Sequence, residues 1–113
     1  MKDCIFCKIV QGEIPAEVVR ETADFIVIKD IEPKASVHLL LIPKVHIPSL
    51  NEVAETHILL LGKMLHAAKQ LAQEFDVAKS GYKLINNCGK DAGQEVAHLH
   101  IHLLGGKKMQ DLV

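Results

Sequence analysis

Apolar residues recur along the chain in two different patterns, and each pattern predicts one type of secondary structure. Short segments rich in β-branched and aliphatic residues predict five strands, at 17–21, 24–30, 37–43, 81–87 and 96–104. The third strand is apolar on both faces except for His38, which is typical of a central strand. Since short turns link consecutive strands and the helical segments lie apart, we expect an α+β fold with an antiparallel sheet of about five strands.

Two further segments have helical spacing. Residues 4–11 predict a short N-terminal helix that ends at Gly12. A long helix is predicted to follow Ser49 and Glu52, which are spaced as a capping box, although its first turn can fall a few residues later. Its helical spacing continues to about Phe75.

The long helix has two neighbouring apolar stripes rather than one. The first contains Ile58, Leu61, Leu65, Ala68, Ala72 and Phe75. The second contains Leu60, Met64, Ala67 and Leu71. A single contact with a sheet needs less apolar surface than this. We therefore expect the second stripe to pack on another subunit, the alternative being a helix buried deeply within one chain.

Length, charge and cysteine content limit the classes of protein. With 113 residues, 49% of them hydrophobic, the chain is expected to form a single domain over residues 1–113. Its scattered charges, 13 basic and 14 acidic, argue against nucleic-acid and membrane partners. Three cysteines, no signal-peptide pattern and no apolar run of 18 residues predict a soluble, cytoplasmic protein without a disulfide framework.

Three of the seven histidines alternate with apolar residues at positions 98, 100 and 102. On a strand these imidazoles share one face, and each disfavours protonation of the next. Two interpretations are open. His98, His100 and His102 could hold Zn²⁺ with one open position, as in a metal hydrolase. Alternatively, one imidazole is a nucleophile toward phosphorus, while its neighbours bind phosphate oxygens and move protons.

The loop before the histidines favours phosphorus chemistry. Gly89 and Gly93 lie within the segment 87–94, and main-chain N–H groups in such loops can hold a phosphate. A nucleophilic imidazole also needs its other nitrogen to donate a hydrogen bond, for which a backbone carbonyl is suitable. We expect this bond at the nucleophile.

A second candidate site begins at the C-x-x-C sequence of Cys4 and Cys7. This spacing places both thiols on one face of a short helix or turn. The βαβ pattern of a thioredoxin-like redox pair is missing, so a metal site is favoured, with two small buried residues as the alternative. Two further ligands are needed, and Cys88 is expected to be an inert thiol.

Three stretches of the sequence together resemble the histidine triad superfamily of nucleotide-binding proteins. They are "CIFCKIVQGEIPAEVV", "IKDIEPKASVHLLLIPKVHI" and "NCGKDAGQEVAHLHIHLLGG", in the expected order and spacing. The ending Leu104-Gly105-Gly106 resembles the branch that removes amines from nucleoside monophosphates, rather than the dinucleoside polyphosphate hydrolases. The resemblance also implies a homodimer with a sheet that continues across the interface.

The resemblance implies a role for each matching residue. His100 matches the nucleophile that becomes nucleotidylated, and His102 and His38 match residues that contact the phosphate and assist proton transfer to the amine. Asp30 matches the carboxylate that accepts hydrogen bonds from the ribose hydroxyls. Glu95 stands where many eukaryotic members have a serine near the leaving group. The matching base-pocket positions are Phe6, Ile9, Ile14, Ile31 and Leu40, and those of the phosphate loop are Asn87, Gly93 and Val96.

The resemblance also supplies the two missing metal ligands. Bacterial-type members with this C-x-x-C bind zinc with two further histidines, which match His46 and His98 here. A site closed by Cys4, Cys7 and these two imidazoles would be structural, and it would leave His100 and His102 for catalysis.

The sequence therefore predicts a hydrolase that cleaves the P–N bond of purine nucleoside 5'-phosphoramidates through a nucleotidyl-histidine intermediate. Structural zinc is the implied cofactor. A dinucleoside polyphosphate hydrolase with the same triad is one alternative. A zinc-stabilised nucleotide-binding module that interacts with a protein, with incidental turnover, is the other.

Overall fold

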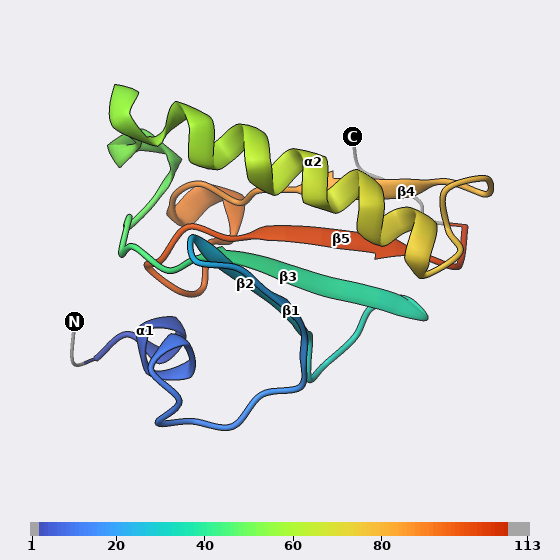
Figure 1. Ribbon diagram of the computed structural model, residues 1–113, viewed down its shortest axis with the longest axis horizontal. Coiled ribbons are helices and arrows are strands. Elements are labelled where there is room, and N and C mark those ends of the chain that lie inside the picture. The colour runs from blue at the N-terminus through green and yellow to red at the C-terminus, as the bar shows by residue number, and fades with distance from the viewer. Residues whose placement is uncertain (1–2, 109–113) are drawn as a thin grey trace.

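Five strands form one antiparallel sheet in the computed structural model, which describes residues 3–108 (Figure 1). They are β1 (Val18–Glu21), β2 (Phe25–Lys29), β3 (Val37–Pro43), β4 (Tyr82–Ile85) and β5 (Ile101–Gly105). The strand order is β1-β2-β3-β5-β4, and all four pairings are antiparallel. The predicted α+β architecture is confirmed, and β3 lies in the middle of the sheet.

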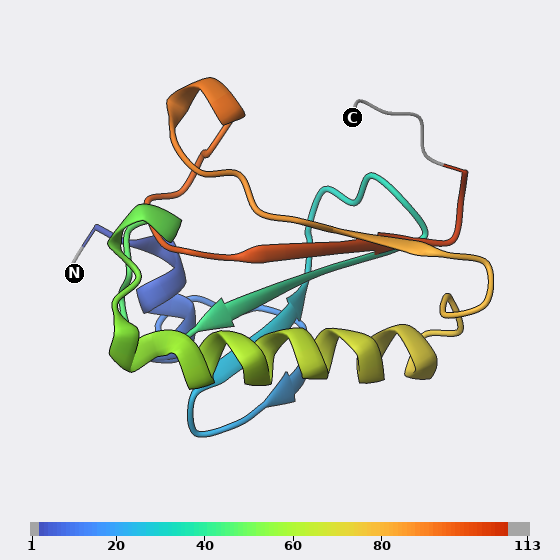
Figure 2. The same cartoon turned by 90° about the horizontal axis from the view of Figure 1, so that it is seen from above.

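Two α-helices and three short 3₁₀ turns accompany the sheet. The helices are α1 (Ile5–Val10) and α2 (Ile58–Glu74), and the turns are η1 (Leu50–Glu52), η2 (Glu55–His57) and η3 (Lys90–Ala92). The long helix α2 extends across one face of the sheet, whereas α1 lies at the other side (Figures 1 and 2). No helix within residues 3–108 has the length and apolar character needed to cross a membrane.

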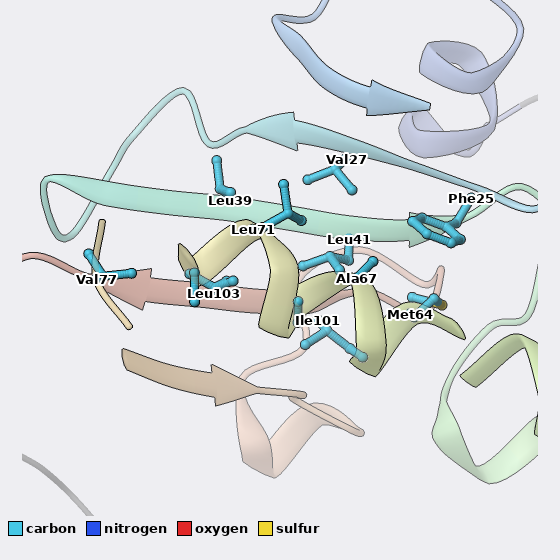
Figure 3. Close-up of a cluster of buried hydrophobic side chains, with 12 residues drawn as sticks. Phe25, Val27, Leu39, Leu41, Met64, Ala67, Leu71, Val77, Ile101 and Leu103 are labelled. Carbon is cyan, nitrogen blue, oxygen red and sulfur yellow. The ribbon is translucent and has the colours of Figure 1, made fainter. Parts of the chain in front are cut away.

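Side chains of the central strands alternate between the two faces. On the α2 side, Val27, Leu39 and Leu103 pack with Met64 and Leu71 of the helix (Figure 3). On the opposite side, a smaller cluster joins Phe6 of α1 to four strand residues, Ile26, Ile28, Leu40 and Ile42. Both faces of β2 and β3 are therefore covered, and the histidines of β3 and β5 point to the face without α2.

The second apolar stripe of α2 does not face another subunit, contrary to expectation. Met64, Ala67 and Leu71 are at most 4% exposed and form the core against the sheet. The alternative of a helix buried within one chain is correct for this stripe, because strands β2, β3 and β5 present enough apolar side chains to cover it. The exposed apolar residues of α2 are instead Ile58, Leu59 and Leu65.

Two element boundaries differ from the predicted ones. After Ser49 the chain forms the short turn η1, which ends because Val53 has an extended conformation. The turn η2 follows, and α2 begins at Ile58. The strand predicted at 96–104 begins at Ile101. The preceding residues leave the ladder, since the His98 N–H donates to Val96 O and the Leu99 N–H donates to Ile47 O.

Gly105, the last residue of β5, and Gly106 after it allow other chain segments to approach closely. A Cβ atom at Gly105 would lie 2.8 Å from Val77 Cβ. Gly106 has a φ of +92°, and a Cβ there would lie 2.0 Å from Ser36 Oγ. The Ser36 hydroxyl donates to Gly106 O at 3.1 Å. The Ser36 contact holds the turn between β2 and β3 against the end of β5, and Gly105 lets the segment after α2 approach β5 at Val77.

Candidate active site and metal cluster

A cavity of about 330 Å³ lies on the sheet face opposite α2. Strands β3, β4 and β5 supply its floor with His38, Leu40, Ile85, His102 and Leu104. The walls come from α1, from the turn after β2 and from the loop before β5. The cavity thus brings together segments from both ends of the sequence.

His100 lies at this cavity, 6% exposed, with its two ring nitrogens in different environments. Its Nδ1 is 2.7 Å from the main-chain oxygen of His98. A carbonyl oxygen only accepts hydrogen bonds, so Nδ1 carries the proton and Nε2 keeps a lone pair. Phe6 supports the ring edge-on, with ring centroids 5.0 Å apart. The hydrogen bond expected of a nucleophilic imidazole is present.

His38 and His102 form a hydrogen-bonded pair beside His100. His38 Nε2 lies 3.0 Å from His102 Nδ1 and 3.4 Å from Asp30 Oδ2. The other nitrogen of His38, Nδ1, lies 3.1 Å from the main-chain N–H of Lys34. The rings of His100 and His102 meet with centroids 5.1 Å apart. The three imidazoles therefore form one contiguous group.

Burial keeps two of these imidazoles neutral. Burial lowers the pKa of His38, and the Asp30 carboxylate offsets only part of that effect. Burial, together with the neighbouring His100 and His38, lowers the pKa of His102 to about 4. Each of the two rings consequently has a single N–H at neutral pH.

Most residues expected to bind a nucleotide line the same cavity. Asp30, Phe6 and Leu40 do so, together with Asn87, Gly93, Glu95 and Val96. Three residues expected in the base pocket, Ile9, Ile14 and Ile31, do not line this cavity. Ile9 packs beside Phe6 against the small core cluster. Ile31, directly after Asp30, is 92% exposed.

Four lining residues were not expected from the sequence, namely Glu32, Lys34, Ile85 and Leu104. Ile85 lies opposite His102 in the β4–β5 ladder, and Leu104 lies opposite His38 in the β3–β5 ladder. The alternation of β5 already placed Leu104 on the face of His102. The position of Ile85 depends on strand register, for which the sequence has no signal.

The glycine-containing loop uses many of its own amides. The N–H groups of Ala92, Gly93 and Gln94 donate to carbonyls within the loop. The Gly89 N–H donates to the Gln94 side chain at 2.8 Å, and the same side chain donates to Pro48 O and Val96 O. The Gly93 N–H, which the sequence suggested could hold a phosphate, already donates to Lys90 O within the loop. Gln94, which sequence analysis missed, holds the loop in place.

Cys4, Cys7, His46 and His98 form a second cluster, whose ligand atoms all lie within 4.8 Å of one another. His98 Nδ1 lies 3.2 Å from Cys4 Sγ, 3.6 Å from Cys7 Sγ and 3.2 Å from His46 Nδ1. His46 Nδ1 lies 3.3 Å from Cys7 Sγ. The structure therefore brings together the four residues that the resemblance implied.

The donor set and spacing of this cluster fit a tetrahedral zinc ion. Zn–N bonds of about 2.0–2.1 Å and Zn–S bonds of about 2.3 Å give ligand separations of roughly 3.3–3.8 Å. His98 Nε2 is 2.8 Å from Pro43 O, so Nε2 carries the proton and Nδ1 presents its lone pair to the other ligands. Burial raises the pKa of the Cys7 thiol, which disfavours an uncompensated thiolate there and favours one bound to a cation.

These two clusters define a histidine triad domain with a Cys₂His₂ group that could hold a metal. A sequence model described as "Scavenger mRNA decapping enzyme C-term binding" matches residues 3–112. Protein HitA of Neisseria gonorrhoeae is 50% identical over 105 residues, covering 93% of this chain and 97% of that protein. The purine nucleoside phosphoramidase of Escherichia coli K12 is 40% identical over 108 residues, covering 96% and 91%.

Solved structures agree with these relatives. A HIT family hydrolase from Legionella pneumophila superposes with a TM-score of 0.93 at 48% identity and covers 96% of both chains. A zinc-bound histidine triad family protein from Mycobacterium smegmatis has a TM-score of 0.81 at 30% identity, covering 94% of this chain and 76% of that one. The chain belongs to the histidine triad (HIT) superfamily and is a homologue of HIT family hydrolases.

Proposed function

We propose that this chain is a cytoplasmic, single-domain hydrolase of purine nucleoside 5'-phosphoramidates. The observation that carries the proposal is the hydrogen bond from His100 Nδ1 to His98 O, at 2.7 Å. It leaves the Nε2 lone pair of His100 at the cavity, where a nucleophile toward phosphorus is needed. The similarity to the E. coli purine nucleoside phosphoramidase supports the same substrate class.

The reaction proceeds in two displacements at phosphorus. His100 Nε2 attacks the α-phosphorus, a P–N bond to the imidazole forms, and the P–N bond to the amine breaks as His102 supplies a proton. Water then attacks the same phosphorus and gives a proton back to His102, the P–N bond to His100 breaks, and the nucleoside monophosphate is released. His102 contacts the phosphate oxygens and moves protons in both steps. His38 has both ring nitrogens engaged, with the Lys34 N–H and with His102 Nδ1, and so it assists proton transfer through its hydrogen bond to His102.

The nucleoside is held by the walls of the cavity. Asp30 accepts hydrogen bonds from the two ribose hydroxyls, and Phe6 and Leu40 contact the base. Ile9, Ile14 and Ile31 remain proposed base-pocket positions by resemblance. Asn87, Gly93, Glu95 and Val96 surround the phosphate and the leaving group. Because Gly93 uses its N–H within the loop, its contribution is close approach of the main chain rather than a donated hydrogen bond.

Zinc has a structural role in this proposal. When bound, it links α1 through Cys4 and Cys7 to His46 and His98, and a closed site of this kind stabilises the fold. His98 is fully buried, and its Nε2–H bond to Pro43 O keeps Nδ1 available as a ligand. The chemical step itself uses only the imidazoles at the cavity.

A homodimer is part of the same proposal. β4 is an edge strand of the sheet, and an unpaired edge can continue into a second copy. Leu84 of β4 is 40% exposed. On α2, Ile58, Leu59 and Leu65 are between 50% and 69% exposed. Sedimentation of wild type and Leu84→Lys tests this. We expect a dimer that dissociates in the variant, and a monomeric wild type would contradict it.

The test of function is steady-state hydrolysis of adenosine 5'-phosphoramidate beside a diadenosine polyphosphate, with excess chelator. Wild type, His100→Ala and the matched control His66→Ala are compared, since His66 is exposed on α2. We expect phosphoramidate cleavage that is lost only in the His100 variant. Preference for the polyphosphate would assign the chain to the dinucleoside polyphosphate hydrolases. Nucleotide binding without turnover of either substrate would favour the zinc-stabilised binding module.

A further inference from the structure

We propose that the main-chain N–H of Lys34 is a positioning group that fixes the tautomers of His38 and His102. Through this chain of hydrogen bonds, His102 presents its Nε2–H to the cavity. The inference rests on the proposed function for its catalytic consequence, but not for its geometry.

The first step is at His38 Nδ1. This nitrogen lies 3.1 Å from the Lys34 main-chain nitrogen. A peptide N–H only donates, so Nδ1 must accept and cannot carry a proton. In a neutral imidazole the proton is then on Nε2.

The second step is at His38 Nε2, which faces two acceptors. His102 Nδ1 is 3.0 Å away and Asp30 Oδ2 is 3.4 Å away. Asp30 is itself held in place, because its Oδ1 accepts from the Glu32 N–H at 2.8 Å. A protonated Nε2 satisfies both acceptors, in agreement with the assignment made from the Lys34 side.

The third step is at His102. Since His102 Nδ1 accepts from His38, the single proton of this neutral ring is on Nε2. Within residues 3–108, no protein group is hydrogen bonded to that Nε2, and the ring lines the cavity. The pKa of His102, lowered to about 4, keeps the ring neutral through the physiological range. His102 thus offers a proton where His100 offers a lone pair.

The turn that carries Lys34 is fastened at both sides of this contact. The Asp30 N–H donates to His38 O at 3.0 Å, and Ser36 donates to Gly106 O at 3.1 Å. The Lys34 N–H therefore has a fixed position relative to the His38 ring. Because a main-chain group donates, this hydrogen bond does not require a lysine side chain at position 34.

The experiment reads the tautomers directly by NMR of ¹⁵N-labelled wild-type protein, loaded with zinc and without nucleotide. We expect His38 and His102 protonated at Nε2, His100 protonated at Nδ1, and a scalar coupling between the Lys34 amide nitrogen and His38 Nδ1. A His38 ring protonated at Nδ1 would overturn the proposal. Because no substrate is present, this outcome does not depend on whether the chain hydrolyses phosphoramidates.

A pair of variants tests the catalytic consequence. Lys34→Pro removes the N–H, whereas Lys34→Ala removes the side chain and keeps it. General acid catalysis contributes roughly 10²–10⁴-fold, and so we expect kcat to be at least about tenfold lower in the Pro variant than in the Ala variant, with a similar KM. Equal kcat values in two folded variants would overturn the positioning role. If the Pro variant does not fold, the wild-type spectrum decides.

Discussion

Two groups of side chains in this protein have ligand atoms that converge within 4.8 Å, and they have different chemistry. One is Cys4, Cys7, His46 and His98, and the other is Asp30, His38 and His102. By proximity alone, both would pass as metal sites. The two groups differ in one main-chain contact. In each group, one imidazole has a ring nitrogen that points away from the other side chains of the group, and this nitrogen faces a carbonyl in the first group and an N–H in the second.

In the first group His98 faces the Pro43 carbonyl, so its inner nitrogen has a lone pair for a metal. In the second group His38 faces the Lys34 N–H, so its inner nitrogen has a proton and repels a metal. The same residue type therefore presents a lone pair to the first group and an N–H to the second. The lesson is that a histidine's function is read from both ring nitrogens, including the one that faces away from the site.

The largest effect is expected from His100→Ala, which removes the proposed nucleophile and leaves the four residues of the Cys/His cluster unchanged. Losing a nucleophile leaves little catalysis, so kcat should fall by at least about 10³-fold. Zinc content, measured by atomic emission on the same preparation, should equal that of wild type. Loss of the metal in this variant would mean that the two groups are not separate.

The second prediction, Cys4→Ser, acts on the Cys/His cluster instead of the active-site cavity. We expect zinc to be lost and the free energy of unfolding to fall by more than about 3 kcal/mol, since structural zinc in small peptides contributes about 10–16 kcal/mol. Denaturant unfolding with parallel metal analysis checks this. The free thiol Cys88 lies outside the cluster, which makes Cys88→Ser the matched control. Full zinc retention in the Cys4 variant would contradict a structural metal site.

A smaller effect is expected from Asp30→Asn, which keeps the side-chain shape and removes its charge. Hydrogen bonds to a charged group contribute about 1.5–3 kcal/mol, so KM for the phosphoramidate should rise about tenfold, with zinc content unchanged. Asp24→Asn alters an exposed carboxylate paired with Lys63 at 3.2 Å and is the control. An unchanged KM would remove Asp30 from the ribose site.

The smallest effect is a pH dependence. His102 has a pKa of about 4 in the folded chain against 6.5 for a free histidine, so the unfolded chain binds more protons between these values. The stability gained from the neutral ring is complete above pH 6.5 and is lost as the pH falls toward 4. His102→Gln should therefore show a shallower loss of unfolding free energy over this range. Parallel curves for variant and wild type would show that His102 is not buried as described.

Much of the fold follows from local pattern. Apolar residues at the spacing of each element made three features predictable: the β2 and β3 segments, the short helix α1 and the number of strands. The start of α2 was not. Ser49 and Glu52 are spaced as a capping box, but the Ser49 hydroxyl donates to the Glu52 carboxylate at 2.6 Å, and the helix begins six residues later, at Ile58.

The side chains of the site were predictable from the sequence, whereas its main-chain hydrogen-bonding groups were not. The alternation of His98, His100 and His102, with the family resemblance, identified the residues that converge in the structure. The Lys34 N–H and the Pro43 carbonyl left no trace in the sequence, because every residue type except proline has the same N–H and every residue has the same carbonyl. Gln94 was missed because its bonds depend on loop conformation.

His98 links the Cys/His cluster to His100 at the cavity. Its imidazole lies beside the sulfur atoms of Cys4 and Cys7, while its main-chain oxygen accepts the hydrogen bond from His100 Nδ1–H. The consequence is evolutionary. A descendant that exchanges the two cysteines for other residues gives up one of the contacts that hold residue 98. The Pro43 carbonyl and the surrounding packing must then keep the oxygen of residue 98 in place for His100.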